Sequence, residues 1–365
     1  MSRATGLSRQ GRLTSAWVAL VLAACNHTAP FVTGFYRATG PFAEIAGEEQ
    51  LTVGGVSFGA WSSDGARILS LTSGSGCFNA LPAAGGSGLW FHCNAGGGYS
   101  AAALDGHGRI VFQIWNAGLP LFPVRGQADF WVVDTTRPYS LIHKLLTLYR
   151  DTVGLAVVSP TTVNWIAQSS WMGPDTFVVV GQNLKPNGTF TTLGVYRGVI
   201  RDTAELTGPL SGTAGKAHYG FADGGHTVVF SDSGSLVLWK ASFDDIQPSE
   251  MIATIPHDSD RSIVDLSCGG NRCVVLTDEL VLGRVPAQNH VGATLWELDL
   301  ATGAVTSRFE FPGTGVLKAL PNTVSVSPIS GDVVVMQGAS WIDDPHSRPA
   351  WVGGELYLLP GVLPD

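Results

Sequence analysis

The chain has 365 residues, with 29 acidic against 21 basic side chains and a formal net charge of −8. An acidic surface repels phosphate backbones, so the composition argues against a nucleic-acid partner. No long stretch repeats its apolar residues with the 3.6-residue period of an amphipathic helix. Short β-rich runs separated by Gly, Asp, Asn and Pro dominate instead, and they predict an all-β protein.

The first residues have the pattern of an export signal. A basic start with Arg3, Arg9 and Arg12 precedes the apolar run 16–24. This run is about nine residues long, far short of the roughly 20 that cross a bilayer. Its basic flank and small-residue exit are those of a secretory signal, and we expect residues 1–24 to be removed.

The end of this signal resembles the lipobox of bacterial lipoproteins, since Leu22-Ala23-Ala24-Cys25 joins an apolar run and small residues to a cysteine. The resemblance implies that Cys25 is lipidated, that 25–30 is a short tether, and that the membrane is reached through the lipid only. By the same resemblance, Asn26 in place of Asp implies the outer membrane of a Gram-negative bacterium, with the protein facing the periplasm or the surface. The alternative is an ordinary signal peptide with a cysteine nearby by chance.

Four further cysteines predict two disulfides in an exported protein: Cys77, Cys93, Cys268 and Cys273. Three connectivities are open. We favour Cys77–Cys93 and Cys268–Cys273, because each pair brackets an apparent hairpin loop. A zinc site is the alternative, but Cys268 and Cys273 have no histidine nearby at ligand spacing.

A strand–turn–strand unit recurs along the chain. In 58–69 a strand ends at Trp61, Ser-Asp-Gly makes a tight turn, and a second strand starts at Ile68. The run resembles the repeat signature of TolB-like β-propellers with WD-type repeats. Weaker copies occupy 104–112, 221–230 and 326–335, whereas 171–179 and 266–275 share only the strand–turn–strand pattern.

Strands built around an aromatic residue alternate with these turns, at 89–91, 130–134, 193–196, 236–239, 295–299 and 355–359. Six turns with six such strands predict one propeller domain, residues 31–365, of six four-stranded blades. Seven blades remain open, because 94–99 is too short and Gly-rich to be a normal fourth strand of the first blade.

The chain ends six residues after its last aromatic strand, so the last blade lacks an outermost strand. We expect an N-terminal strand to complete it and remove an open sheet edge. The candidates for this strand are Phe31–Tyr36 and Phe42–Ile45.

Loops between the second and third strands of all blades emerge on one face of a propeller. We expect long loops in five blades, at 73–88, 114–129, 181–192, 279–293 and 337–353, and a tight turn at 231–235 in the fourth. Long loops commonly carry function. The candidate binding residues on this loop face are Trp115, Arg125, Lys185, Arg284, His290, Trp341, Asp343, Asp344, His346, Arg348 and Trp351.

The last loop is the richest, because two tryptophans flank acids, a histidine and an arginine in 341–351. Such a set suits a sugar ring or a peptide. The alternative is that both tryptophans pack beneath the loop.

His257-Asp258-Ser259-Asp260 and the acids of this loop offer too few ligands for Ca²⁺, so we expect no metal and no cofactor. Ser57, in a G-x-S-x-G match, lies within a strand rather than a nucleophile elbow, so no catalytic residue is identified.

These observations predict a monomeric, membrane-anchored envelope propeller that binds an envelope protein or a glycan. The alternative is an envelope hydrolase or lyase that acts on a sugar or lactone at the propeller axis. Convergent carboxylates with strongly shifted pKa values at the axis would favour the enzyme. An axis lined by apolar or backbone groups would favour the binding module.

Overall fold

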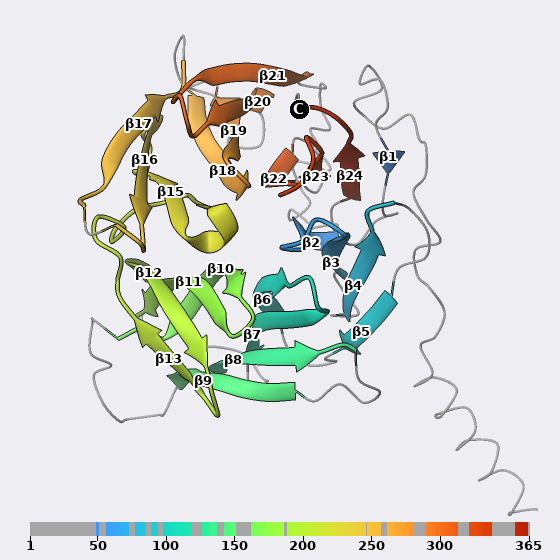
Figure 1. The fold of residues 1–365 in the computed structure, drawn as a ribbon, viewed down its shortest axis with the longest axis vertical. Helices are drawn as coiled ribbons and strands as arrows, with labels where there is room; N and C mark the ends of the chain where they lie inside the picture. The colour runs from blue at the N-terminus through green and yellow to red at the C-terminus, as the bar shows by residue number, and fades with distance from the viewer. Residues whose placement is uncertain are drawn as a thin grey trace, which may run out of the picture.

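Six antiparallel sheets stand as blades around a central axis in the computed structural model of the chain (Figure 1). The structure describes residues 49–50, 56–72, 77–84, 89–93, 98–117, 126–136, 142–150, 162–185, 188–245, 247–256, 261–280, 290–312, 321–337 and 355–363. Each sheet has four strands. The predicted all-β propeller of six four-stranded blades is therefore confirmed.

The strands of each blade follow one another outward from the axis. The first blade contains β2 (Val56–Trp61), β3 (Arg67–Thr72), β4 (Cys77–Pro82) and β5 (Leu89–Cys93). The second contains β6 (Gly98–Leu104), β7 (Arg109–Ala117), β8 (Gly126–Asp134) and β9 (Ile142–Arg150). The third contains β10 (Trp165–Gly173), β11 (Thr176–Leu184), β12 (Phe190–Ile200) and β13 (Ala204–Thr207).

The second half of the ring repeats this order. The fourth blade contains β14 (Tyr219–Ala222), β15 (Thr227–Ser231), β16 (Val237–Ser242) and β17 (Glu250–Thr254). The fifth contains β18 (Arg261–Gly269), β19 (Arg272–Leu280), β20 (His290–Asp299) and β21 (Val305–Pro312). The sixth contains β22 (Pro321–Val326), β23 (Val333–Gln337), β24 (Glu355–Leu359) and β1 (Glu49–Gln50). The short 3₁₀ helix η1 (Asp223–Gly225) follows β14, and no helix in the described part of the chain is long and apolar enough to cross a membrane.

An N-terminal strand closes the last blade, as predicted, but it is a different strand from those proposed. β1 pairs antiparallel with β24, with Glu49 opposite Leu358 and Gln50 opposite Tyr357. An outermost strand needs only backbone pairing, so this polar dipeptide carries no apolar signal. The two proposed segments, 31–36 and 42–45, lie outside the described residues, as do Cys25 and the predicted signal and tether.

The first blade is complete, contrary to the doubt raised by its Gly-rich stretch. The expected long loop 73–88 contains strand β4, and 89–93 is the fourth strand of the blade rather than the third. Residues 94–99 therefore need not supply a strand of this blade. The error arose because Leu89-Trp90-Phe91 matches the aromatic pattern of third strands elsewhere.

Apolar clusters fill the space between neighbouring blades around the whole ring. The second strand of each blade is covered on both sides, so it reads as a continuous apolar run. In β11, for example, Phe177, Val178, Val179 and Val180 are all buried. The six principal clusters each join one blade to the next, including the sixth to the first. Ring closure thus buries an apolar face that a single blade would expose.

The Ser-Asp-Gly turn of the first blade has the geometry that its sequence predicts. The Oγ of Ser62 accepts a hydrogen bond from the backbone N–H of Arg67 at 3.0 Å, and it donates to Oδ1 of Asp64 at 2.6 Å. Gly65 has φ = +68°, a conformation that favours glycine. The turn places the start of β3 beside the end of β2, at one end of the axis.

Candidate functional site

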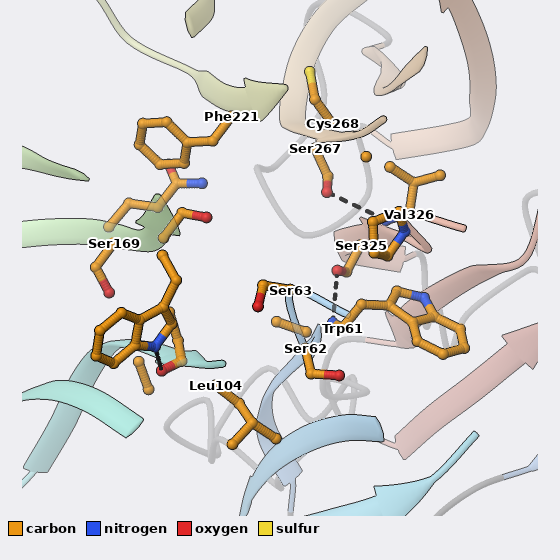
Figure 2. A pocket seen from close by; sticks show the side chains of 18 of the residues that line it. Trp61, Ser62, Ser63, Leu104, Ser169, Phe221, Ser267, Cys268, Ser325 and Val326 are labelled. Carbon is orange, nitrogen blue, oxygen red and sulfur yellow. Dashed lines mark hydrogen bonds between the residues drawn. The ribbon is translucent and has the colours of Figure 1, made fainter. Parts of the chain in front are cut away.

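A cavity of about 700 Å³ lies on the axis of the ring (Figure 2). Residues from the first strand of every blade line it, or from the turn that follows that strand. We call it the axial cavity. Its lining residues lie within 59–63, 99–104, 167–171, 221–225, 265–270 and 323–329, and Leu71 of β3 adds to them.

The axial cavity lies toward the end of the ring that carries the turns between first and second strands. Ser62, Ser63, Gly224, Gly270 and Ile329, which belong to these turns, contribute to its lining. Because neighbouring strands are antiparallel, the loops between second and third strands emerge at the opposite end. The cavity is therefore not on the loop face that the sequence favoured as the binding site.

Small and hydroxyl-bearing side chains dominate the lining. Serines contribute from five of the six blades: Ser62, Ser63, Ser100, Ser169, Ser170, Ser267 and Ser325. The charged residues in the described lining are Asp223, which is exposed, and Asp265, which is partly buried. The described lining contains no Lys, Arg or His. The cavity thus combines neutral hydrogen-bonding groups with negative charge.

Bulges in the first strands turn particular side chains toward the axis. The strand register shifts between Ile166 and Gln168, between Ile263 and Asp265, and between Pro321 and Thr323. The first and second blades have comparable shifts, at 56–58 and 100–103, whereas β14 has none. A bulge bends its strand and re-aims the residue beside it. Gln168, Asp265 and Thr323 each follow a bulge, and each lines the cavity.

Two serines at equivalent positions join neighbouring blades along the cavity wall (Figure 2). The Oγ of Ser325 accepts a hydrogen bond from the backbone N–H of Trp61 at 3.0 Å. The Oγ of Ser267 accepts one from the backbone N–H of Val326 at 3.2 Å. A hydroxyl that accepts a bond can still donate one. These side chains therefore hold the wall together and retain an O–H for a ligand.

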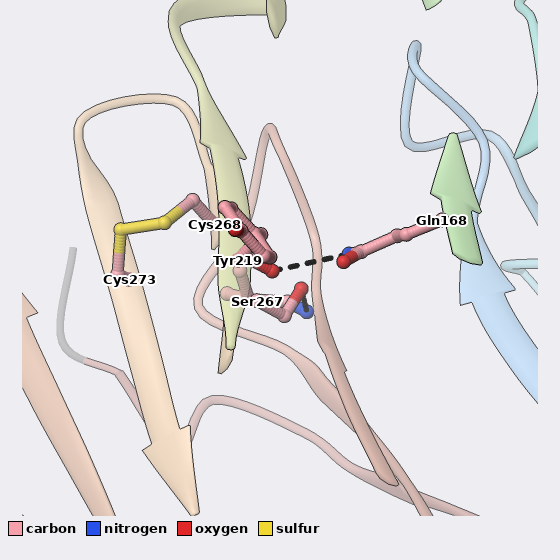
Figure 3. Close-up of a disulfide and its surroundings, with 6 residues drawn as sticks. Gln168, Tyr219, Ser267, Cys268 and Cys273 are labelled. Carbon is pink, nitrogen blue, oxygen red and sulfur yellow. Dashed lines mark hydrogen bonds between the residues drawn. A yellow bond between two sulfur atoms is a disulfide. The ribbon is translucent and has the colours of Figure 1, made fainter. Parts of the chain in front are cut away.

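The opposite wall uses different side chains for the same purpose. The Oγ of Ser169 donates to the carbonyl oxygen of Ala101 at 2.6 Å, which joins the third blade to the second. The amide Nε2 of Gln168 donates to the carbonyl oxygen of Tyr219 at 3.1 Å, which joins the third blade to the fourth (Figure 3). Side chains on both walls thus bridge neighbouring blades, which favours a preformed cavity.

Among the carboxyl groups that the structure describes, Asp265 has the most strongly raised pKa. Its Oδ1 accepts a hydrogen bond from the backbone N–H of Leu266 at 2.9 Å, and its Oδ2 accepts one from that of Val324 at 2.8 Å. Burial raises the pKa of Asp265 to about 7, and the two backbone hydrogen bonds limit the rise. In the described part of the chain, no basic side chain forms an ion pair with it. This carboxyl therefore titrates much nearer neutral pH than an ordinary aspartate does.

A disulfide joins Cys268 on β18 to Cys273 on β19, beside the cavity (Figure 3). The two residues form a register pair just before the turn, and Cys268 lines the cavity. Gly220 of the fourth blade packs against this residue, since a Cβ built at Gly220 would lie 2.6 Å from Sγ of Cys268. The hairpin and its neighbouring blade are thus closely fitted at the wall.

The second predicted disulfide has compatible backbone positions. Cys77 on β4 lies opposite Cys93 on β5 in the strand register. The side chains of both residues lie outside the described part of the structure, so this pairing stays a prediction.

The predicted loop-face residues fall almost wholly outside the described residues. Trp115 and His290 lie on β7 and β20 by their backbones, but their side chains are not described. The remaining candidates with no described position are Arg125, Arg284, Trp341, Asp343, Asp344, His346, Arg348 and Trp351. The structure therefore does not test whether these residues form a binding surface.

Two of the five predicted long loops are short. Only 73–76 separate β3 from β4 in the first blade. In the third blade only 185–189 separate β11 from β12, and the backbone N–H of Lys185 donates to the carbonyl oxygen of Thr189 at 2.9 Å. The first error arose because β4 lies within the expected loop, and the second because β11 and β12 extend into theirs.

Sequence reasoning placed a site at the axis only in its alternative interpretation and named no residue for it, although a signal for such residues exists. Asp265-Leu266-Ser267 and Thr323-Val324-Ser325 share one spacing of polar residues in the first strands of neighbouring blades. Polar residues at the same position of successive blades converge at the axis. No group of three or more His, Cys, Asp or Glu within the described residues is placed to hold a metal ion.

No protein-family model matches the chain, and no curated protein matches it. Solved structures similar to it include a gluconolactonase from Xanthomonas campestris, with 13% identity, TM-score 0.49, and coverage of 90% of this chain and 94% of that one. An oligogalacturonate lyase in complex with manganese has 13% identity, TM-score 0.47, and coverage of 85% and 78%. A TolB protein from Agrobacterium tumefaciens has 16% identity, TM-score 0.43, and coverage of 88% and 97%. These likenesses assign no function.

Proposed function

We propose that the protein is a binding module that holds a small polar molecule in its axial cavity. The observation that carries this proposal is the cavity itself, because first strands from all six blades converge on one hollow lined by hydroxyls and two carboxyls. Its size is within the range of small-molecule sites, and a few convergent polar groups are typical of them. Hydrogen bonds between blades, such as those of Ser267 and Ser325, support a site that exists before the ligand arrives.

The composition of the lining favours binding over catalysis. Asp265 is a single carboxyl with a strongly raised pKa, and Asp223, the other acid of the described lining, is exposed. Acid–base catalysis commonly uses two groups whose environments push their pKa values apart. The remainder of the described lining is uncharged: serines, alanines, glycines, apolar side chains, Tyr99, Gln168, Cys268 and Thr323.

A second candidate function is that of an envelope hydrolase or lyase acting on a sugar or lactone. Asp265 is the observation that favours it, because a carboxyl with a pKa of about 7 is suited to general acid–base work. Turnover of such substrates that is lost in Asp265→Asn would support the enzyme over the binding module.

The location in the cell rests on the sequence. We propose that Cys25 anchors the propeller to a membrane of the cell envelope, where the ligand or partner would be a glycan, another small molecule or an envelope protein. Replacing Cys25 with Ala should release the protein into the soluble fraction. Continued membrane retention without a protein partner to explain it would contradict the lipid anchor.

The binding function is tested by a variant that fills the cavity. Ala167 follows Ile166 at the bulge of β10, is exposed and lines the cavity, so Ala167→Phe places a ring in it. Ala214→Phe, at an exposed position in the segment before β14, is the matched control. The full chain is purified from its native envelope and analysed by native mass spectrometry. A bound small molecule that is absent from Ala167→Phe and retained in Ala214→Phe supports the proposal, whereas equal retention in both variants contradicts it.

A further inference from the structure

We infer that the axial cavity selects a small organic cation, whose ammonium or guanidinium group is held by Asp265. This inference rests on the proposed function, because it names the chemical class of the ligand that the cavity takes. Three features of the site carry it: the sign of its charge, the donors and acceptors it offers, and its size.

The described lining is negative and has no base to neutralise it. Asp223 and Asp265 are its charged residues. Arg109, a base near the same end of the ring, is already engaged, since its Nε lies 2.7 Å from Oδ2 of Asp105 and its guanidinium lies 4.8 Å from the centre of the Trp171 ring. The negative charge of the lining would therefore attract a cation, because no basic side chain of the described lining neutralises it.

Asp265 has acceptor capacity left for such a group. Each oxygen of an ionised carboxylate can accept more than one hydrogen bond, and each oxygen of Asp265 takes one from a backbone N–H. A primary ammonium or a guanidinium group donates several hydrogen bonds and accepts none, whereas a quaternary ammonium has no N–H and is held by the charge of the carboxylate and by aromatic faces. Charge-assisted bonds of this kind are about twice as strong as neutral ones.

The size and lining of the cavity favour an organic cation over a metal ion. A cation such as Ca²⁺ takes six to eight oxygen ligands. The described residues hold no group of three or more His, Cys, Asp or Glu placed for a metal, whereas the cavity measures about 700 Å³. Tyr99 and Phe221 add aromatic side chains to the lining, and aromatic faces attract organic cations.

Protonation of Asp265 would compete with this cation. The carboxyl has a pKa of about 7, raised by burial, so a cation gains most above that pH. Other titratable groups on the elements packed around it are engaged in other contacts or exposed. On β14, Tyr219 donates to the carbonyl oxygen of Thr213, and Asp223 at the end of the strand is exposed. On β19, Arg272 lies near Glu297 and Asp278 accepts a hydrogen bond from Ser262. Arg261 on β18 donates a hydrogen bond to Thr294. Burial raises the pKa values of Tyr99 and Tyr219, so both stay protonated.

Calorimetric titration of the full chain with choline and with agmatine tests the inference. The matched control ligand is the neutral isostere of choline, in which carbon replaces the quaternary nitrogen. We expect at least one of the two cations to bind about tenfold or more tightly than the neutral isostere. Asp265→Asn should weaken that binding about tenfold or more, whereas Asp223→Asn, at the exposed acid, should weaken it less than about threefold. Equal binding of the neutral isostere, no binding of either cation, or unchanged affinity in a folded Asp265→Asn variant overturns the inference.

Asp265→Asn turns an amide N–H₂ toward one backbone N–H, so the variant can lose stability. A second measurement on the unaltered protein avoids this difficulty. Between about pH 6 and about pH 8 the affinity for the cation should rise about tenfold, because the ionised fraction of a carboxyl with a pKa of about 7 rises by that factor. An affinity that is flat over this range contradicts a role for Asp265. If native mass spectrometry reveals a neutral ligand that Ala167→Phe loses, the inference fails while the proposed function stands.

Discussion

The Oδ2 of Asp265, in the fifth blade, accepts a hydrogen bond of 2.8 Å from the backbone N–H of Val324, in the sixth. The same carboxyl lines the axial cavity. One side chain thus takes part both in the junction of two blades and in the candidate site. The protonation of Asp265 is therefore expected to affect stability as well as binding.

The stability of the protein should depend on pH through this residue. The folded-state pKa of Asp265, about 7, lies above its ordinary value of 3.8, so the folded state holds this proton more tightly than the unfolded state. Its contribution to the free energy of unfolding is greatest below about pH 4 and falls as the pH rises to about 7, by roughly 1.4 kcal/mol for each unit of pKa difference.

Urea unfolding at a series of pH values checks this prediction. The difference in stability between the unaltered protein and Asp265→Asn should shrink by a few kcal/mol between about pH 4 and about pH 8. Ser267→Ala, a neutral change on the same strand, should keep the pH slope of the unaltered protein. If the unfolding free energies of the unaltered protein and of Asp265→Asn change in parallel with pH, burial does not raise the pKa of Asp265.

Ser325→Ala should weaken the junction between the sixth and first blades. The change removes the acceptor for the backbone N–H of Trp61 in a buried hydrogen bond of 3.0 Å. Leaving a buried donor unsatisfied costs about 1–3 kcal/mol of unfolding free energy. Ser233→Ala, in an exposed turn, is the control and should change stability by less than about 0.5 kcal/mol. Similar stabilities for the two variants would argue against a role of Ser325 in ring closure.

Gly220→Ala should disturb the packing of the fourth blade on the fifth. The added Cβ would lie 2.6 Å from Sγ of Cys268, so β14 or the disulfide hairpin must shift. Overpacking of this kind costs about 1–3 kcal/mol. At Gly173 an added Cβ meets nothing within 4 Å, so Gly173→Ala serves as the control in the same unfolding measurement. Equal effects of the two substitutions would contradict the close fit at the cavity wall.

Both predicted disulfides can be identified by peptide mapping without reduction. We expect one linked pair from Cys268 and Cys273 and one from Cys77 and Cys93, which lie opposite each other in their strand registers. Removing the first bridge with Cys268→Ser and Cys273→Ser together should lower the unfolding free energy by about 2 kcal/mol, because its loop is short. A peptide that links one pair to the other would refute the local pairing.

Much of the fold could be predicted from local chemistry. The turn at Ser62-Ser63-Asp64-Gly65 follows from a side-chain hydrogen bond and from a glycine with positive φ, and both are properties of residues next to one another. The apolar runs of strands such as β11 reflect burial on both faces. Signals of this kind repeat with each blade, so the number of blades could be inferred.

The closing strand and the cavity depend on partners distant in sequence. Glu49 and Gln50 pair with β24 through the backbone, and nothing in two polar side chains indicates that pairing. The cavity arises where first strands from six blades meet, and bulges decide that Gln168 and Asp265 line it. Sequence analysis weighted long loops and aromatic residues instead, and so favoured the opposite face of the ring.

A crystal structure of the full chain with its co-purified small molecule bound would test the central claim most directly. Our account predicts ligand density on the axis, at the end where the first and second strands turn, with a polar or cationic group within hydrogen-bond distance of Asp265. Ligand density on the face of the loops between second and third strands, with the axial cavity holding only water, would contradict it.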